Sequence, residues 1–379
     1  MTNKVSHFVF YKEYQFYSSF PAVLTLSDNT ILLMFRRARD VRWLIDGDCE
    51  ESQLLKLQVD HIDSRSQLTK IILNQDLEIL SPARSLSPDP EAGDQDASLL
   101  LLKDDSLLLS SFAWYPLPAR IANQLRKNGI GSAGSMSSSG CSYIMWGGFV
   151  RKSSDLARHW TAHNYLPPLP GAGEIIPEKR ASCGGAIRGQ AIEIGDEILL
   201  PVYIRLKNHK TDGCHLYISK DNGNSWTYRS AIAIDKDQTI HFNEPSLLQC
   251  GSSKIVAFMR TANADDHLYT AVSNDRGHSW KHWQKQNIVG HPTHPLRLKD
   301  GRILLSYGYR HEPYGIRARI MDDEAEHFIG DEIIVRDDAI CADIGYPCAT
   351  QLANGKVLIV YYFTKEDGIR QIAGSVLSV

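Results

Sequence analysis

One hairpin pattern recurs six times along the chain and limits what the chain can fold into. Each copy has a short apolar run, a turn of Asp, Asn, Gly or Ser, and a second apolar run that ends in aromatic or basic residues. Short runs rich in Leu, Ile and Val, bounded by turn residues, indicate paired strands. A unit that recurs this often predicts a repeat architecture. The copies begin at Phe20, Asp96, Gly184, Glu244, His291 and Tyr346.

A second motif, Ser-x-Asp-x-Gly-x-x-Trp, stands between successive hairpins. It is intact at residues 219–226 and 273–280 and degraded at residues 153–160, and a remnant with Asp323 and Phe328 precedes the sixth hairpin. Asp and Gly suit a tight turn, and Trp is large enough to fill the gap between neighbouring sheets. The motif therefore predicts architecture, and we expect no catalysis by its aspartates.

Together the two motifs predict an all-β fold. Each unit is expected to be a four-stranded antiparallel sheet, with the hairpin inside and the Asp motif joining the two outer strands. Six such sheets around an axis form a six-bladed β-propeller, which makes residues 1–379 a single domain. The N-terminal run, residues 6–12, would close the ring by pairing in the sixth unit, after residues 369–379. A seven-bladed ring is the weaker alternative because we find no seventh hairpin.

Composition narrows the expected partners. The net charge is −3, with acids and bases interspersed, which predicts no nucleic-acid partner. The chain has no run of transmembrane length and no apolar signal segment at its start, so we expect no membrane partner and a cytoplasmic location. Its seven cysteines include no Cys-x-x-Cys spacing, which argues against a disulfide framework or a zinc site. Nothing in the sequence indicates the oligomeric state.

Strand direction predicts which face of the propeller carries the chemistry. In each unit, the innermost strand starts and the second strand ends on one face, whereas the Asp motifs lie on the other. Acids, histidines, arginines and tyrosines gather on the first face. Such a ring suits a polar, anionic small molecule or glycan, because a guanidinium grips a carboxylate bidentately and aromatic rings support sugar faces. The members at strand starts include Asp96, Glu244, His291, His294 and Tyr346, and those at strand ends include Arg36, Arg37, Arg39, Tyr203, Arg205, Arg260, Tyr309, Arg310, Tyr361 and Tyr362.

Several segments resemble the sialidase (neuraminidase) superfamily of six-bladed propellers. The likeness covers nearly the whole chain and rests on the two intact Asp motifs, on NEPSLL with VAFMR, on YGYRHEPYGIRARI and on ADIGYPCATQLANGKVLIVYY. The resemblance implies that Tyr346 is the nucleophile and that Glu244 assists it as a base. It also implies that Arg260 grips the substrate carboxylate as one of three arginines, with Arg310 and Arg317 competing for another place.

The resemblance further implies an acid on the loop after the first unit's second strand. This acid would protonate the leaving oxygen. On that loop Asp46 is the nearest candidate, followed by Asp48 and then Asp40. Asp96 is another acid at a strand start, and it either lines the site as a substrate-binding residue or caps a turn.

The first unit departs from the superfamily pattern. Ser19 stands where the superfamily has the first arginine of its triad. Arg36, Arg37 and Arg39 on the adjacent strand are candidates to reach the same space, and Arg37 is assigned to substrate binding. Losing one of the three arginines that bind the substrate carboxylate would weaken binding by a few kcal/mol. The sequence therefore leaves open which sugar is bound.

The function implied by the resemblance is that of a retaining exo-glycoside hydrolase. Its substrate would be a sialic acid or a related acidic sugar at a non-reducing end, with a tyrosine in place of the usual carboxylate nucleophile and with no cofactor. One alternative is a diverged propeller glycosidase that uses two carboxylates, such as Glu244 with Asp46 or Asp96. Another is a lectin-like propeller without catalysis. We expect His291 and His294 to be structural, and no metal site, because no third ligand stands at a useful spacing.

Overall fold

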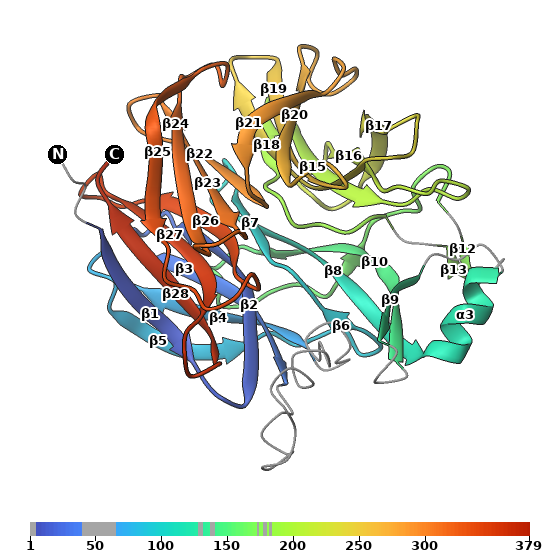
Figure 1. Ribbon diagram of the computed structural model, residues 1–379, viewed down its shortest axis with the longest axis horizontal. Coiled ribbons are helices and arrows are strands. Elements are labelled where there is room, and N and C mark those ends of the chain that lie inside the picture. Colours follow the sequence, from blue (N-terminus) through green and yellow to red (C-terminus); the bar gives the residue numbers. More distant parts are fainter. Residues whose placement is uncertain are drawn as a thin grey trace.

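Six antiparallel sheets stand around a central axis in the computed structural model (Figure 1). The structure describes residues 5–39, 66–127, 132–136, 141–172, 174–176, 180–181 and 184–379. The colours pass once around the ring from blue to red, so successive stretches of chain form successive blades. The predicted all-β, six-bladed propeller is confirmed.

The first three blades follow the predicted order of strands. Blade 1 consists of β2 (Phe16–Thr25), β3 (Ile31–Arg39), β4 (Gln67–Leu73) and β5 (Ile79–Ser85). Blade 2 consists of β6 (Gly93–Asp94), β7 (Ser98–Leu101), β8 (Leu107–Pro118), β10 (Cys141–Ser153) and β11 (Asn164–Tyr165), with β9 (Ser132–Met136) added to β10. Blade 3 consists of β14 (Ile192–Ile194), β15 (Glu197–Ile204), β16 (Gly213–Ser219) and β17 (Thr227–Ala233).

The last three blades have the same order of strands, except that the N-terminal strand completes blade 6. Blade 4 consists of β18 (His241–Cys250), β19 (Lys254–Ala262), β20 (His267–Ser273) and β21 (Gln284–Val289). Blade 5 consists of β22 (Thr293–Arg297), β23 (Ile303–Tyr309), β24 (Gly315–Met321) and β25 (Phe328–Arg336). Blade 6 consists of β26 (Gly345–Gln351), β27 (Val357–Thr364) and β28 (Arg370–Leu377), completed by β1 (Ser6–Lys12).

The N-terminal strand closes the ring. β1 pairs antiparallel with β28, with Ser6 opposite Val376 and Lys12 opposite Gln371. Strands β1 and β28 accordingly lie side by side in Figure 1. Closure ties blade 6 to the start of blade 1 and covers an edge that would otherwise expose unpaired backbone groups. The closure predicted from residues 6–12 is confirmed.

The Asp motif forms the turn between the third and fourth strands of its blade. In blade 3, Asp221 Oδ1 accepts the backbone N–H groups of Asn224 at 3.1 Å and Ser225 at 2.8 Å. Gly223 has a φ of 80°, and a Cβ there would lie 3.1 Å from Leu108 of blade 2. Trp226 is buried in the apolar cluster between these two blades. The motif therefore fixes a turn and packs one blade against the next.

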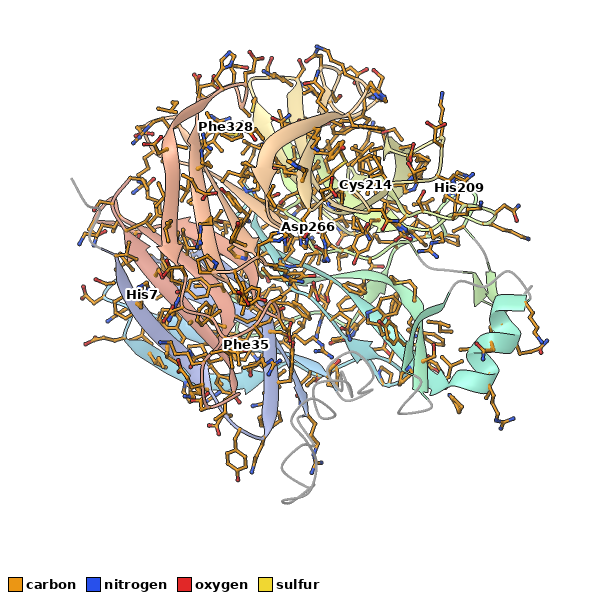
Figure 2. The ribbon with its side chains drawn as sticks, in the orientation of Figure 1. His7, Phe35, His209, Cys214, Asp266 and Phe328 are labelled. Carbon is orange, nitrogen blue, oxygen red and sulfur yellow. The ribbon has the colours of Figure 1, made fainter. Side chains whose placement is uncertain are left out.

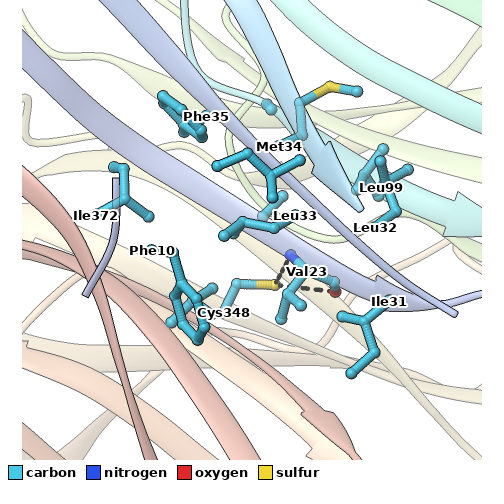
Figure 3. Close-up of a cluster of buried hydrophobic side chains, with 14 of the residues drawn as sticks. Phe10, Val23, Ile31, Leu32, Leu33, Met34, Phe35, Leu99, Cys348 and Ile372 are labelled. Atoms are coloured by element: carbon cyan, nitrogen blue, oxygen red, sulfur yellow. Dashed lines mark hydrogen bonds between the residues drawn. The ribbon is translucent and has the colours of Figure 1, made fainter. Parts of the chain in front are cut away.

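The apolar core lies in layers between neighbouring blades. Residues 31–35 of β3 are all 0% exposed, because blade 1 is covered on both faces. A strand covered on both faces reads as a continuous apolar run. Figure 3 shows part of the layer between blades 6 and 1, where Phe10, Ile372 and Val23 lie close to Cys348. Burying one such apolar side chain contributes about 1.5–3 kcal/mol, so these layers hold the ring together.

Connections of blades 2 and 3 carry the remaining elements at the rim of the ring (Figure 1). These are the nine-residue helix α3 (Ala119–Lys127) and the small hairpin of β12 (Glu174–Ile176) and β13 (Arg180–Ala181). Within the described ranges, no helix has the length and apolar character needed to span a membrane.

Candidate active site

Three innermost strands each have a bend of the same kind where they line the channel. Phe20 in β2, Glu244 in β18 and Tyr346 in β26 each precede a proline, and their φ angles are 54°, 47° and 51°. The pairing register of each strand shifts at this point. Positive φ is uncommon outside glycine, and a β-bulge re-aims a side chain. Each such residue costs on the order of 1–3 kcal/mol and is typical of functional sites.

Glu244, Arg260 and Tyr346 meet at these bends. The Tyr346 hydroxyl donates to Glu244 Oε1 at 2.6 Å. Arg260 Nη1 donates to both carboxylate oxygens of Glu244 at 3.1 Å and to the Tyr346 hydroxyl at 3.0 Å. The register places Asn243 opposite Arg260, so β18 and β19 bring the acid and the arginine to the same end of blade 4. The structure thus gathers the predicted nucleophile, base and carboxylate-binding arginine in one cluster.

Burial and charge keep the tyrosine protonated and the glutamate ionised. Burial, followed by the negative charge of Glu244, raises the pKa of Tyr346 far above its ordinary value. Burial alone would also raise the pKa of Glu244, but the Arg260 charge and the Tyr346 hydrogen bond bring that pKa below its ordinary value. The pair is therefore a neutral phenol that donates a hydrogen bond to a carboxylate.

Asp96 lies beside this cluster, and its pKa is raised, whereas that of Glu244 is lowered. It is 4% exposed, and its Oδ2 lies 3.6 Å from Arg188 Nε. Burial raises the pKa of Asp96 to about 7, although Arg188 opposes the change, and the charge of Glu244 adds to it. Near neutral pH, Asp96 can therefore act as a hydrogen-bond donor or as an acceptor.

Arg188 is a site residue that the sequence analysis missed. Its Nη2 donates to the backbone oxygens of Tyr346 at 3.0 Å and Pro21 at 3.3 Å, so it braces the bends of blades 6 and 1. A signal for it exists. Arg188 stands eight positions before Asp196, which lies in the turn of the blade 3 hairpin. The same spacing separates Asp96 from the turn residue Asp104 in blade 2, and Tyr346 from the turn residue Asn354 in blade 6. The repeat itself therefore marks Arg188 as the channel residue of blade 3.

Of the two candidate arginines of blade 5, Arg310 and Arg317, the structure brings Arg310 to the cluster. The Arg310 guanidinium carbon lies 5.4 Å from the centre of the Tyr346 ring, and Nη2 donates to the Tyr362 hydroxyl at 3.3 Å. Arg317 instead lies within the wall of blade 5, where Nη1 donates to the backbone oxygen of Arg336 at 2.8 Å. Of these two candidates, Arg310 therefore lies beside Tyr346 and Arg317 does not.

The structure also does not bring Arg37 to the cluster. Arg37 donates to the Tyr11 hydroxyl at 3.1 Å and to Ser85 Oγ at 2.9 Å, on the other face of blade 1. Its neighbour Arg36 is fully buried, stands opposite Ser19 in the register, and lies 5.9 Å from the centre of the Phe20 ring. Adjacent strand residues point to opposite faces, so a guanidinium from β3 occupies the side where Ser19 replaces the expected arginine.

The three candidates for the acid, Asp46, Asp48 and Asp40, lie outside the described residues. The structure therefore adds nothing to their assignment.

Two histidines and an aspartate lie at the rim of the cluster. His291 Nε2 and His311 Nε2 lie 3.1 Å and 3.2 Å from the two carboxylate oxygens of Asp266, which is near the middle of the view in Figure 2. Burial lowers the pKa of His291 to about 4, and the Arg260 and Arg310 charges contribute. His291 is thus a neutral, paired histidine. Among the residues that the structure describes, no three His, Cys, Asp or Glu side chains gather as a metal site would require.

The accessible charge of the cluster is positive. The side chain of Arg260 is 25% exposed, whereas that of Glu244 is 5% exposed. The three hydrogen bonds of Arg260 all come from Nη1, which leaves Nη2 for a ligand. Arg310 is also partly exposed. An approaching ligand therefore meets two guanidinium groups above a buried phenol and carboxylate, which suits an anionic group such as a carboxylate.

Comparison with known proteins places these features in a family. Residues 131–359 match the family described as BNR repeat-like domain. A comparison with curated proteins gave no match. A protein of unknown function from Dyadobacter fermentans has a similar structure, with a TM-score of 0.85 and 32% sequence identity over 99% of each chain.

Two sialidases share the fold at much lower identity. The NanB sialidase from Streptococcus pneumoniae has a TM-score of 0.63 and 12% identity, over 98% of this chain and 70% of that chain. The Trypanosoma rangeli sialidase, in complex with 2,3-difluorosialic acid as a covalent intermediate, has a TM-score of 0.63 and 11% identity, over 98% of this chain and 59% of that chain. At such identities the likeness extends to the fold alone.

Proposed function

Because the chain belongs to the BNR repeat-like family and has the six-bladed propeller of the sialidase superfamily, we propose that it is a retaining exo-glycoside hydrolase. Its substrate is a sialic acid or a related 2-keto sugar acid at a non-reducing end. The observation that carries the proposal is the contact of the Tyr346 hydroxyl with Glu244 at 2.6 Å and with Arg260 at 3.0 Å.

In the proposed first step, Tyr346 attacks the anomeric carbon. The Tyr346 oxygen forms a bond to that carbon while the bond to the leaving oxygen breaks, and the phenolic proton passes to Glu244 Oε1. A phenol whose pKa is raised is a weak nucleophile, so this proton transfer must accompany the attack. An acid protonates the leaving oxygen, and Asp46 stays the first candidate for that acid.

In the second step, water releases the sugar. The deprotonated acid removes a proton from the water as its oxygen attacks the anomeric carbon. The bond to the Tyr346 oxygen breaks, and Glu244 returns its proton to that oxygen. Two displacements at one carbon retain its configuration. No cofactor is needed for either step.

Arg260 and Arg310 would bind the carboxylate of the sugar. Both are partly exposed and both lie close to Tyr346. A neutral phenol also suits this substrate, because a carboxylate nucleophile would be repelled by the carboxylate of the sugar. Arg36 supplies positive charge on the side where Ser19 stands. Asp96, whose pKa is about 7, can bond to a hydroxyl of the sugar in either protonation state.

The test is hydrolysis of a panel of aryl glycosides by the intact protein. The panel contains a sialic acid, other 2-keto sugar acids, the methyl ester of each acid, and neutral sugars. We expect turnover of an acid, and a loss of at least about tenfold for its ester, because the ester removes the charge that Arg260 and Arg310 bind. Turnover of neutral sugars alone would refute the proposed substrate, and binding of an acid without turnover would refute the hydrolase.

A further inference from the structure

The innermost strands enclose a cavity of about 180 Å3 directly behind the cluster. All six blades contribute to its wall. Arg188 and Glu244 line it on the side of the cluster, and Leu24, Leu101 and Leu296 line it nearer to the hairpin turns. These three leucines are partly exposed, so that end of the cavity meets solvent. Small molecules therefore have a route into the channel from the face opposite the proposed active site.

A thiol and an imidazole contact each other in the wall of this cavity. Cys348 Sγ lies 3.8 Å from His294 Nε2, within the range of a hydrogen bond to sulfur. The backbone N–H of Val23 donates to the same sulfur at 3.4 Å, and the protonated thiol donates to the Val23 backbone oxygen at 3.7 Å; the two dashed lines in Figure 3 mark these contacts. An N–H donor and an imidazole beside one sulfur are the surroundings that stabilise a thiolate.

A second polar group in the wall is left without a partner. Thr293 lines the cavity and is 6% exposed, and its Oγ1 makes no hydrogen bond in the structure. Buried hydroxyl groups are normally satisfied, so an unsatisfied one beside a cavity points to a small polar molecule that bonds to it. Thr293 and His294 are consecutive residues of β22, so their side chains lie on opposite faces of that strand, and both line the cavity.

The other buried thiols of the described residues differ from Cys348. Burial raises the pKa of Cys214 and of Cys250. Burial alone would do the same to Cys348, but the charge and hydrogen bond of His294, the Val23 N–H group and the Arg188 charge bring its pKa below the ordinary value. The charged or titratable groups that share the cavity wall with Cys348 are His294, Arg188 and Glu244.

We propose that Cys348 and His294 form a second reactive site, at which small uncharged electrophiles such as hydrogen peroxide modify the thiol inside the channel. The thiolate sulfur attacks one peroxide oxygen, the O–O bond breaks, and an S–O bond forms. The departing hydroxide takes the proton that the thiol has given to His294, and it leaves as water. The sulfur is oxidised to a sulfenic acid, and the peroxide is reduced. Cys348 lies two residues after Tyr346 in β26, so this modification takes place beside the proposed nucleophile.

The test measures labelling of each cysteine in the intact native protein. Methyl methanethiosulfonate, which is small and uncharged, is added for short times, and the modified peptides are quantified by mass spectrometry. We expect Cys348 to be modified at least about ten times faster than Cys214 and Cys250. Its rate should have a midpoint below the pH of ~8.5 that is typical of a free thiol. Equal rates at the three cysteines, or a midpoint at or above that pH, would overturn the proposal.

Two further arms examine the imidazole and the oxidant. His294→Gln should slow the modification of Cys348 at least about tenfold, whereas His327→Gln, an exposed histidine of the same blade, should leave the rate unchanged. Thermal melting checks that both variants fold. Limiting hydrogen peroxide should oxidise Cys348 before Cys214 and Cys250. An unchanged rate in folded His294→Gln, or oxidation that spares Cys348, would contradict the proposal. None of these measurements depends on glycoside hydrolysis.

Discussion

Two Tyr–Glu–Arg groups lie in this propeller, one in the channel and one in the wall of blade 5. The channel group is Tyr346, Glu244 and Arg260, and the wall group is Tyr307, Glu332 and Arg317. In both groups the tyrosine donates to the glutamate, and the arginine lies beside the same carboxylate. The chemical groups are the same, so the difference between the two groups shows what makes a site.

The first difference is how the chain assembles each group. The wall group comes from three consecutive strands of one blade, β23, β24 and β25. The channel group joins blades 4 and 6, and two of its members have positive φ angles. The side chain of Glu332 is 42% exposed, whereas that of Glu244 is 5% exposed. Charge interactions are stronger where water is excluded, so the channel group alone combines strain with a strong local field.

The second difference is the freedom of the arginine. Arg317 donates to the backbone oxygens of Arg336 at 2.8 Å and Pro313 at 3.3 Å, and it is 3% exposed. Arg260 uses one nitrogen and keeps the other for a ligand. The wall arginine therefore supports the fold, and the channel arginine is available for recognition.

The largest contrast is expected for the two tyrosines. Tyr346→Phe should lower kcat on the best acidic aryl glycoside by at least about 10³-fold, because it removes the nucleophilic oxygen. The Phe ring keeps the contact with Phe20, whose ring centre lies 4.6 Å away. Tyr307→Phe should change kcat by less than about twofold, since it removes a hydrogen bond in the wall. Similar losses in both variants would abolish the distinction between the groups.

The two glutamates should differ next. Glu244→Gln keeps the shape and one hydrogen bond but cannot accept the phenolic proton, so kcat should fall by about 10²–10⁴-fold. Glu332→Gln should leave kcat unchanged, because Glu332 is distant from the reacting atoms. Steady-state kinetics of both variants give the comparison. Full activity in Glu244→Gln would exclude Glu244 as the base.

The two arginines should differ in their effect on stability. Arg260→Met leaves the buried Glu244 carboxylate unpaired, and the free energy of unfolding at pH 7 should fall by about 3–5 kcal/mol. Arg317→Met should cost about 1–2 kcal/mol. In the folded native protein, the pKa of Glu244 is lower than in the unfolded chain. Ionised Glu244 therefore stabilises the fold at pH values above its pKa in the unfolded chain, and this stabilisation is lost as the pH falls. The deficit of Arg260→Met in urea unfolding should therefore shrink towards pH 4.

Two aspartates with opposite pKa changes should differ in how their substitution alters the pH dependence of stability. Burial raises the pKa of Asp96 to about 7 in the folded protein. The native protein should therefore lose stability as the pH rises from the pKa of an aspartate in the unfolded chain towards 7. Asp96→Asn removes this loss, and its Tm relative to the native protein should rise between pH 5 and 8. Asp338 in the wall is bonded to Arg336, which lowers its pKa, so Asp338→Asn should show no such rise. Parallel changes in both variants would contradict the assigned electrostatics.

The fold could be predicted because its signals are local. Each hairpin shows its two apolar runs and its turn within about twenty residues, and the Asp motif specifies the outer turn. Strand direction alone then brings Glu244, Arg260 and Tyr346 to one face, which is where the structure places them. Their hydrogen bonds could not be predicted, because they depend on the bends before Pro245 and Pro347 and on how six blades close.

The parts that were missed have physical reasons. Arg188 lies in an irregular segment before β14, where no strand start marks it, although its spacing to the turn does. Whether Arg36 or Arg37 faces the side of Ser19 depends on the pairing register of β3. A shift of one residue would turn every side chain of the strand to the other face. Arg310 and Arg317 lie on either side of a turn, and the sequence shows no boundary that separates a channel arginine from a wall arginine.

Trapping the sugar on the protein would identify the nucleophile directly. The native protein is incubated with a 2,3-difluorinated analogue of the acidic sugar that it hydrolyses, and its peptides are examined by mass spectrometry. We expect one adduct, on the peptide that contains Tyr346, and none in Tyr346→Phe. An adduct on an aspartate or glutamate, or an adduct that persists in Tyr346→Phe, would show that the channel tyrosine is not the nucleophile.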